Sequence, residues 1–293
     1  MRWMSHPPFQ VEQLAIVGVG LIGGSIAAAA RSRQLAKRIL GYGRNPSRLE
    51  AACKLGVIDD FGTEPSALKN ADLVVICTPV DQIARDVQMA LGAIPETALV
   101  TDAGSVKGAI VDSVFQNAPR SVQYVPAHPL AGSHLTGFEH STPTLYVNRM
   151  CVITPTSQNR KEDVAAIHQF WRGLGMRTCE MSAEEHDRIL ALTSHLPHLA
   201  AAVVASMVEE PMLEFAAGGY RDTTRVAAGD PGLWTAIFRE NRSQMIEAID
   251  RMMRSIGEFR NALATDDTSA MKEFLSSAQR KRERYRDQGQ SGE

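Results

Sequence analysis

The hydrophobic positions near the start of the chain form one continuous run before they give way to glycine. Residues 14–17 are all apolar, Gly18, Gly20 and Gly23 follow, and residues 26–30 are again apolar. A short apolar run, a glycine-rich turn and an apolar helical segment are typical of a buried parallel strand that leads into a helix. This stretch therefore predicts the first strand, turn and helix of an α/β domain.

Apolar runs and helical periodicity continue to alternate up to about residue 180. Further strands are predicted at residues 38–42, 71–78, 98–102, 122–125, 151–154 and 176–180. Helices are predicted at residues 46–55, 81–91 and 105–115, and another helix closes at 171–175. This alternation favours an α/β fold built on a doubly wound, Rossmann-type parallel sheet.

The pattern changes in the second part of the chain, where residues 184–275 show helical periodicity and hardly a strand. We expect a dinucleotide-binding domain at residues 1–181 and an all-helical substrate and dimerisation domain at residues 182–293. Apolar stripes at residues 203–212 and 245–253 are longer than a small monomeric domain covers comfortably. They favour a homodimer interface in the helical domain over internal packing.

The spacing Gly18-x-Gly20-x-x-Gly23 fits the dinucleotide-binding fingerprint. In that fingerprint the first glycine allows the tight turn, the second lets a pyrophosphate approach the backbone, and the third packs the helix against the strand. The helix that begins at Leu21 and Ile22 would direct its free N–H groups at the phosphates. A tight turn without a ligand is the alternative interpretation of the same glycines.

The end of the second predicted strand bears on the choice of cofactor. An acidic residue there often binds the ribose 2′-hydroxyl of NAD, whereas an arginine accommodates the 2′-phosphate of NADP. Residues 41–45 contain Arg44 and no acid, so NADP is favoured, and NAD stays possible if Arg44 is only a solvated loop residue. Thr78, Pro79 and Val80 follow a central strand and would form one wall of the cofactor cleft, although Thr-Pro also simply ends strands.

Composition narrows the partners and the compartment. The chain has 293 residues, 44% of them apolar and 22% charged, and a net charge of -2, which gives no reason to expect nucleic acid or an anionic membrane as partner. No apolar run approaches the roughly 20 residues of a membrane span, and residues 1–10 lack the core of a signal peptide. The scattered cysteines favour buried thiols in a reducing cytoplasm over a zinc site: Cys53, Cys77, Cys151 and Cys179.

Four more short motifs follow the glycine motif in order. They are Thr-Asp-Ala-Gly-Ser-Val-Lys at 101–107, Pro-Ala-His-Pro-Leu-Ala-Gly-Ser at 126–133, Ser-His-Leu-Pro-His at 194–198 and Gly-Gly-Tyr-Arg-Asp-Thr-Thr-Arg at 218–225. Together the five motifs resemble the prephenate/arogenate dehydrogenase family over about residues 13–260. The resemblance implies that a nicotinamide cofactor oxidises the ring hydroxyl of prephenate or arogenate while the ring carboxylate leaves as CO2. The products would be 4-hydroxyphenylpyruvate or tyrosine.

The resemblance also implies two catalytic residues. His128 matches the histidine of the family's His-Pro-x-Ala-Gly motif and would be the base at the hydroxyl, since imidazole titrates near neutral pH. Ser105 matches the serine of Gly-Ser-x-Lys and would hydrogen-bond the same hydroxyl or hold the histidine in register. Taken without the other motifs, His128 is a histidine packed before a proline turn, and Ser105 lies in an ordinary helix start.

Prephenate carries two carboxylates, and the resemblance supplies residues to bind them. Arg225 matches the family's substrate-clamping arginine, and a guanidinium can bind a carboxylate through two hydrogen bonds. The alternative is a surface pair between Arg225 and Asp222. His198 matches a second substrate-binding histidine, and Ser194 lies one turn away on the same face. Trp234 matches a tryptophan near the pocket, although core packing is the usual role of a lone aromatic residue.

The segment 194–198 places a proline between two histidines. Pro197 removes a backbone hydrogen bond, which predicts a kink that turns His195 and His198 in different directions. Two histidines three residues apart could also bind a metal ion. No third ligand has suitable spacing nearby, so we expect no metal site.

One position departs from the family pattern. Many members have Thr-Glu after His-Pro-x-Ala-Gly, and the glutamate joins an ionic network near the cleft, whereas this chain has Ser133-His134. We include His134 among the substrate-binding residues. We expect the exchange of a carboxylate for an imidazole to alter the pH dependence of activity and access to the site.

Other functions compete with this hypothesis. No acidic residue is placed to bind the amino group of arogenate, so prephenate is favoured and arogenate dehydrogenase is the alternative. A β-hydroxyacid dehydrogenase needs a lysine on its second domain, and none occurs between Lys161 and Lys272. A non-catalytic nucleotide-sensing regulator could use the same scaffold, but it would have no need for His128, Ser105 and Arg225 together.

Overall fold

The structure is a computed structural model that describes residues 9–117, 121–132 and 135–290. His134 lies outside these described residues. Contacts along the backbone divide the chain into two compact units, Met1–Asn241 and Arg242–Glu293. This division falls beyond the domain boundary expected at 181/182, which stays a prediction.

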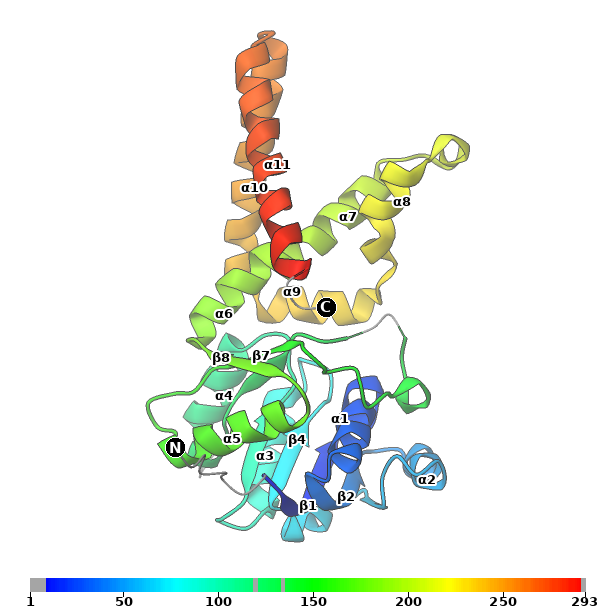
Figure 1. Ribbon diagram of the computed structural model, residues 1–293, viewed down its shortest axis with the longest axis vertical. Helices are drawn as coiled ribbons and strands as arrows, with labels where there is room; N and C mark the ends of the chain where they lie inside the picture. Colours follow the sequence, from blue (N-terminus) through cyan, green and yellow to red (C-terminus); the bar gives the residue numbers. More distant parts are fainter. Residues whose placement is uncertain (1–8, 118–120, 133–134, 291–293) are drawn as a thin grey trace. The chain divides into compact units, whose positions relative to one another are not determined.

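A five-stranded parallel sheet forms the centre of the first unit (Figure 1). Its strands are β1 (Val11–Val17), β2 (Ala36–Tyr42), β3 (Asp60–Gly62), β4 (Leu73–Ile76) and β5 (Leu99–Asp102). Their order is β3-β2-β1-β4-β5, so the chain starts in the middle of the sheet and winds outward in both directions. The connecting helices are α1 (Leu21–Ser32), α2 (Pro46–Lys54), α3 (Ile83–Ala93) and α4 (Gly108–Asn117). The doubly wound sheet predicted from the sequence is confirmed.

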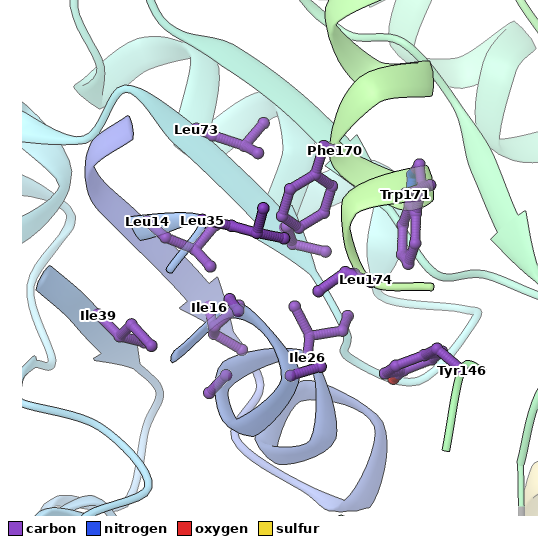
Figure 2. Close-up of a cluster of buried hydrophobic side chains, with 14 of the residues drawn as sticks. Leu14, Ile16, Ile26, Leu35, Ile39, Leu73, Tyr146, Phe170, Trp171 and Leu174 are labelled. Carbon is purple, nitrogen blue, oxygen red and sulfur yellow. The ribbon is translucent and has the colours of Figure 1, made fainter. Parts of the chain in front are cut away.

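The side chains of β1 alternate between two hydrophobic clusters. Leu14 and Ile16 pack with Ile26 of α1 and with aromatic residues from later in the chain (Figure 2). Ala15 and Val17 pack instead with residues of α3 and α4. Because successive side chains of a strand point to opposite faces, helices cover both faces of the sheet, and β1 reads as a continuous apolar run.

A smaller sheet follows the first. It contains β6 (Ala127–Pro129), β7 (Met150–Ile153) and β8 (Arg177–Glu180), with β6 antiparallel to β7 and β7 parallel to β8. Helix α5 (Lys161–Gly173) joins β7 to β8, and its Phe170 and Trp171 enter the core around β1.

The strand predicted at residues 122–125 is wrong. Residues Ser121–Gln123 form a 3₁₀ turn, and only Tyr124 bridges to Val100 of β5. The Gln123 side-chain amide donates to the carbonyl oxygen of Ala98 at 2.6 Å, which satisfies backbone groups that a longer strand would have paired. The short strands β3 and β6 carry too few apolar residues for their pattern to predict them.

Helices occupy the rest of the first unit. They are α6 (Ala183–Leu190), a π-helical turn (Ala191–His195), α7 (Leu196–Ser206), α8 (Gly218–Thr224) and α9 (Pro231–Glu240). Single 3₁₀ turns lie at Pro65–Asn70, Phe138–His140, Glu210–Phe215 and Arg225–Ala228. The π-helical turn comes directly before Pro197, where the missing N–H would otherwise interrupt the helical hydrogen bonds.

The helical run Ala183–Ser206 is, by length and composition alone, apolar enough to cross a membrane. This corrects the expectation that no segment of the chain reaches that length. The run also contains His186, Asp187 and His195, which are buried and hydrogen-bonded to other polar groups of the first unit. Such partners are typical of a helix inside a folded domain.

The second unit is a pair of antiparallel helices, α10 (Arg242–Ala264) and α11 (Thr268–Gln290) (Figure 1). The rings of Phe259 and Phe274 pack 5.2 Å apart between the two helices. The prediction of helices after residue 182 is therefore confirmed in the described residues.

Candidate active site

The three glycines of the β1–α1 turn have three different environments. Gly18 has φ +91°, and a Cβ atom there would lie 2.9 Å from the carbonyl group of Cys77. A Cβ on Gly23 would overlap the carbonyl oxygen of Gly18, whereas a Cβ on Gly20 would meet nothing within 4 Å. The turn is therefore tight at its first glycine, open at its second and packed at its third, as the fingerprint predicts.

A cavity of about 570 Å³ opens at this turn and at the carboxyl ends of β1, β2 and β4. The predicted cofactor residues that line it are Gly18, Gly20, Arg44, Thr78 and Pro79. The hydroxyl of Thr78 is buried in the wall and has no hydrogen-bond partner within the described residues. An open glycine turn and an unpaired hydroxyl fit a dinucleotide, which offers phosphates to the first and polar atoms to the second.

The other predicted cofactor residues do not line the cavity. Leu21, Gly23 and Val80 are buried in the protein interior. The carbonyl oxygen of Ile22 accepts a hydrogen bond from the Tyr146 hydroxyl at 2.8 Å. These side chains shape the helix and the strand behind the cavity.

Three arginines line the same cavity. Arg44 is exposed and forms no ion pair with any described residue, whereas Arg48 lies 3.5 Å from Glu139 and Arg85 lies 3.2 Å from Asp86. Sequence reasoning missed Arg48 and Arg85. Arg48 lies one helical turn beyond Arg44, and this spacing could have revealed it.

His128 lies in the middle of β6, opposite Val152 of β7, and is 9% exposed. Its Nδ1 lies 2.8 Å from Nε2 of His186, and Nδ1 of His186 lies 2.8 Å from Oδ1 of Asp187. Nε2 of His128 has no hydrogen-bond partner among the described residues. The imidazole is therefore held from one side by protein groups and is unpaired on the other.

Sequence reasoning missed His186 and Asp187. Both belong to α6, and Asp187 accepts hydrogen bonds at 2.8 Å from the backbone N–H groups of Lys107 and Gly108 at the start of α4. Asn241 donates to the carbonyl oxygen of Asp187 at 2.9 Å. The signal in the sequence was a His-Asp pair at the beginning of the helical part.

A buried ion pair lies next to His128. Lys107 and Asp102 are both 0% exposed and are bonded to each other. Lys107 also donates to the carbonyl oxygen of Ala127 at 2.8 Å, and Asp102 accepts from the Tyr124 hydroxyl at 2.9 Å and from the Ala127 N–H at 3.0 Å. These bonds satisfy the buried charges and fix the residue before His128 to the end of β5.

Burial keeps the histidines of this cluster neutral. It lowers the pKa of His128 well below its usual range, and the neighbouring His186, Lys107 and His195 lower it further. Burial also lowers the pKa of His186, although the hydrogen bond to Asp187 opposes this, and it lowers the pKa of His195 to about 4. At neutral pH His128 is therefore an uncharged imidazole that can accept a proton.

His198 and Trp234 form a second group. Their rings are stacked at 3.6 Å and 13°, and Gly229 packs so closely that a Cβ there would lie 2.6 Å from the indole nitrogen. Nδ1 of His198 is buried without a hydrogen-bond partner within the described residues. His195 packs on the edge of the same indole at 6.2 Å and contacts Asn241 at 3.1 Å.

The remaining predicted residues are not joined to His128 by hydrogen bonds within the described part of the chain. Ser105 is half-buried in the loop between β5 and α4, and Ser194 is half-buried in the π-helical turn. Arg225 is exposed at the start of a 3₁₀ turn, and Asp222 pairs with Arg221 at 3.4 Å. His134 lies outside the described residues, so its predicted role is not addressed by the structure.

Two family models match the chain. One is described as the nucleotide-binding domain of prephenate dehydrogenase and matches residues 26–180, and the other is its dimerization domain and matches residues 182–277. A prephenate dehydrogenase of Bacillus subtilis is 34% identical over 91% of this chain and 74% of its own length. A cyclohexadienyl dehydrogenase of Zymomonas mobilis is 32% identical over 92% of this chain and 95% of its own.

Solved structures agree with these matches. The prephenate dehydrogenase of A. aeolicus in complex with hydroxyphenyl propionate and NAD+ is 30% identical, with a TM-score of 0.88 over 94% of this chain and 99% of that one. The Synechocystis arogenate dehydrogenase is 27% identical, with a TM-score of 0.82 over 93% of this chain and 99% of that one. The cavity at the glycine turn is thus the site of a nicotinamide cofactor, and the chain belongs to the prephenate dehydrogenase family of oxidoreductases.

Proposed function

We propose that this protein catalyses the nicotinamide-dependent oxidative decarboxylation of prephenate to 4-hydroxyphenylpyruvate, a step of tyrosine biosynthesis. The observation that carries the proposal is His128, a buried neutral imidazole with a free Nε2, in the same folded unit as the cofactor cavity. Prephenate dehydrogenases of Bacillus subtilis and Lactococcus lactis, 34% and 29% identical to this chain, support the choice of substrate.

His128 would move one proton at the ring hydroxyl. The bound nicotinamide supplies a hydride acceptor for the carbon that carries this hydroxyl. His128 Nε2 takes the hydroxyl proton as the carbonyl forms, and a neutral imidazole is suited to this task near neutral pH. The bond to the ring carboxylate then breaks, CO2 leaves, and its electron pair passes through the diene to the carbonyl oxygen. His128 returns the proton to that oxygen, and the aromatic ring makes the step effectively irreversible.

The substrate-binding residues follow from the family motifs. Arg225 would bind a carboxylate with its guanidinium, and Ser105 and Ser194 would bind polar groups of the substrate. The stacked His198 and Trp234 support a role at the substrate, because the buried Nδ1 of His198 lacks a partner that a ligand could supply. His134 belongs to the same proposed group on the strength of its position in the motif alone.

Arogenate is the second candidate substrate, since the Synechocystis relative is an arogenate dehydrogenase. For the cofactor we favour NADP over NAD. The exposed guanidinium of Arg44 lines the cavity without a carboxylate partner in the described part of the chain and could bind a 2′-phosphate.

A homodimer in the cytoplasm is part of the proposal. Apolar side chains of the predicted stripe are exposed after α7, with Met207 75% and Phe215 80% exposed, and a dimerization-domain model matches this region. The cysteines Cys53, Cys77, Cys151 and Cys179 are free thiols, as expected in a reducing compartment.

The decisive experiment is steady-state kinetics of the purified protein with prephenate and arogenate, each combined with NAD and NADP, by the absorbance of the reduced cofactor. We expect the highest kcat/KM with prephenate and NADP. A higher value with arogenate would support the second candidate. Cofactor binding without turnover of either substrate would favour a nucleotide-sensing regulator and contradict the proposal.

A further inference from the structure

The hydrogen bonds behind His128 form a chain of three side chains that the proton transfer above does not use directly. His128 Nδ1 contacts His186 Nε2, and His186 Nδ1 contacts Asp187 Oδ1, each at 2.8 Å. His186 is 0% exposed and Asp187 is 5% exposed. Protein groups, and not bulk water, therefore determine where the protons of these two rings reside.

The position of the first proton follows from Asp187. Its two carboxylate oxygens accept the backbone N–H groups of Lys107 and Gly108, each at 2.8 Å, so the carboxylate is held in its ionised form. An ionised carboxylate is only an acceptor. The hydrogen between Asp187 and His186 is therefore on Nδ1 of His186.

The position of the second proton follows from His186. Complete burial and the neighbouring Lys107 cation oppose a second proton on this ring, so its Nε2 is unprotonated and can only accept. Nδ1 of His128 lies 2.8 Å from that acceptor and must donate to it. The one proton of a neutral His128 is then on Nδ1, which leaves Nε2 free.

We propose that His186, held by Asp187, is a positioning residue that fixes His128 in the tautomer with its proton on Nδ1, so that Nε2 is ready to take the hydroxyl proton. When Nε2 is protonated, the ring becomes an imidazolium whose Nδ1–H still donates to His186, and Asp187 stabilises the positive charge at the far end of the chain. The chain thus offsets the burial that disfavours charge on His128. This inference rests on the proposed function, because it concerns the base of that reaction.

The first test reads the proton position directly and needs no substrate. The imidazole ¹⁵N signals of the full-length protein are recorded at pH 8, and those of His128 are recognised by their loss in His128→Asn. We expect a protonated Nδ1 and an unprotonated Nε2. The opposite tautomer, or a rapid average of both, would overturn the inference.

The second test uses two substitutions of His186 that retain different halves of its contacts. The amide of asparagine reaches about the position of Nδ1, so His186→Asn keeps a donor for Asp187 and removes the acceptor for His128. The amide of glutamine reaches about the position of Nε2, so His186→Gln keeps an acceptor for His128. We expect His186→Asn to lower kcat with prephenate by about 10- to 100-fold at an unchanged KM, and His186→Gln to recover most of the loss.

Two measurements make the second test selective. Circular dichroism and the Kd for the oxidised cofactor verify that both variants fold and bind the cofactor. Wild-type kcat in both variants, or an equal loss in both, would contradict the positioning role. If the wild-type protein fails to turn over prephenate, the proposed function fails, while the tautomer measured by NMR still decides the proton positions.

Discussion

A single imidazole illustrates how this protein prepares a base from residues that are far apart in the chain. His128 comes from the nucleotide-binding region, its partner His186 from α6, and the nearby Lys107 from the loop before α4. Burial keeps all proton-accepting rings of the cluster neutral at pH 7. The function of His128 thus depends on its surroundings as much as on its own side chain.

Replacement of His128 by asparagine should lower kcat by about 10²- to 10⁴-fold with little change in KM for prephenate, because a general base acts mainly in the transition state. Steady-state kinetics measures this effect. His140→Asn is the matched control, since His140 is exposed on the short turn Phe138–His140. A large rise in KM at constant kcat would mean that His128 binds substrate and is not the base.

Arg44 determines the cofactor preference in our proposal. Arg44→Ala should raise KM for NADP by about tenfold and leave KM for NAD almost unchanged, because a lost charge-assisted hydrogen bond to a phosphate costs roughly 1.5–3 kcal/mol. Arg38→Ala is the control, since Arg38 lies on the same strand and pairs with Asp60 at 2.6 Å. Equal effects on both cofactors would contradict a 2′-phosphate contact.

The neutral histidines also make stability depend on pH. His195 has a pKa of about 4 in the folded protein against 6.5 as the ordinary value, so the unfolded chain binds more protons between these pH values. The free energy of unfolding should therefore fall as pH drops from 6.5 to 4, by up to about 1.4 kcal/mol per pH unit for this residue.

Urea titrations at pH 7.5 and pH 5 measure this dependence. His195→Asn keeps an acceptor for Asn241 without a titrating ring, so the difference between the two pH values should shrink in that variant. A wild-type protein that is equally stable at both pH values would contradict the neutral state of the cluster.

At the scale of elements, the β1–α1 turn separates folding from binding. Gly23 is needed for packing, because any side chain there meets the backbone of Gly18, whereas Gly20 faces open space. Gly23→Ala should therefore destabilise the fold by about 1–3 kcal/mol, a fall of several degrees in Tm. Gly20→Ala should leave Tm unchanged and raise the Kd for the cofactor, since its methyl group enters the phosphate site. Thermal melts and cofactor titrations of both variants measure these effects, and a destabilised Gly20→Ala would refute the assignment.

The elements also indicate how far sequence patterns reach. β1 and β4 were predictable because a central parallel strand is apolar on both faces, and Gly18 was predictable because its turn needs a positive φ. β6 was not predictable, since three residues with a proline carry no periodicity. His186 was missed for a similar reason: its partner His128 is 58 residues away in the sequence, and only the folded chain brings the two rings together.

At the scale of the whole molecule, the exposed apolar side chains need a partner surface. Met207 is 75% exposed at the end of α7, in a region matched by a dimerization-domain model. We expect Met207→Glu to shift the protein from dimer toward monomer, because a buried unpaired charge disfavours association. Light scattering after size-exclusion chromatography measures the mass. Leu55→Glu is the control, since Leu55 is 65% exposed at the end of α2 in the nucleotide-binding region. A monomeric wild-type protein would contradict the proposed dimer.

The contact of Asp187 with the first residues of α4 has a consequence for partly assembled molecules. Until α6 docks against α4, Lys107 and Gly108 lack their acceptor, and His186 cannot reach His128. A nascent or locally opened chain can then hold the dinucleotide on its completed sheet while its imidazole rotates freely. Docking of one helix thus acts as a checkpoint of assembly, and turnover begins only in molecules that have passed it.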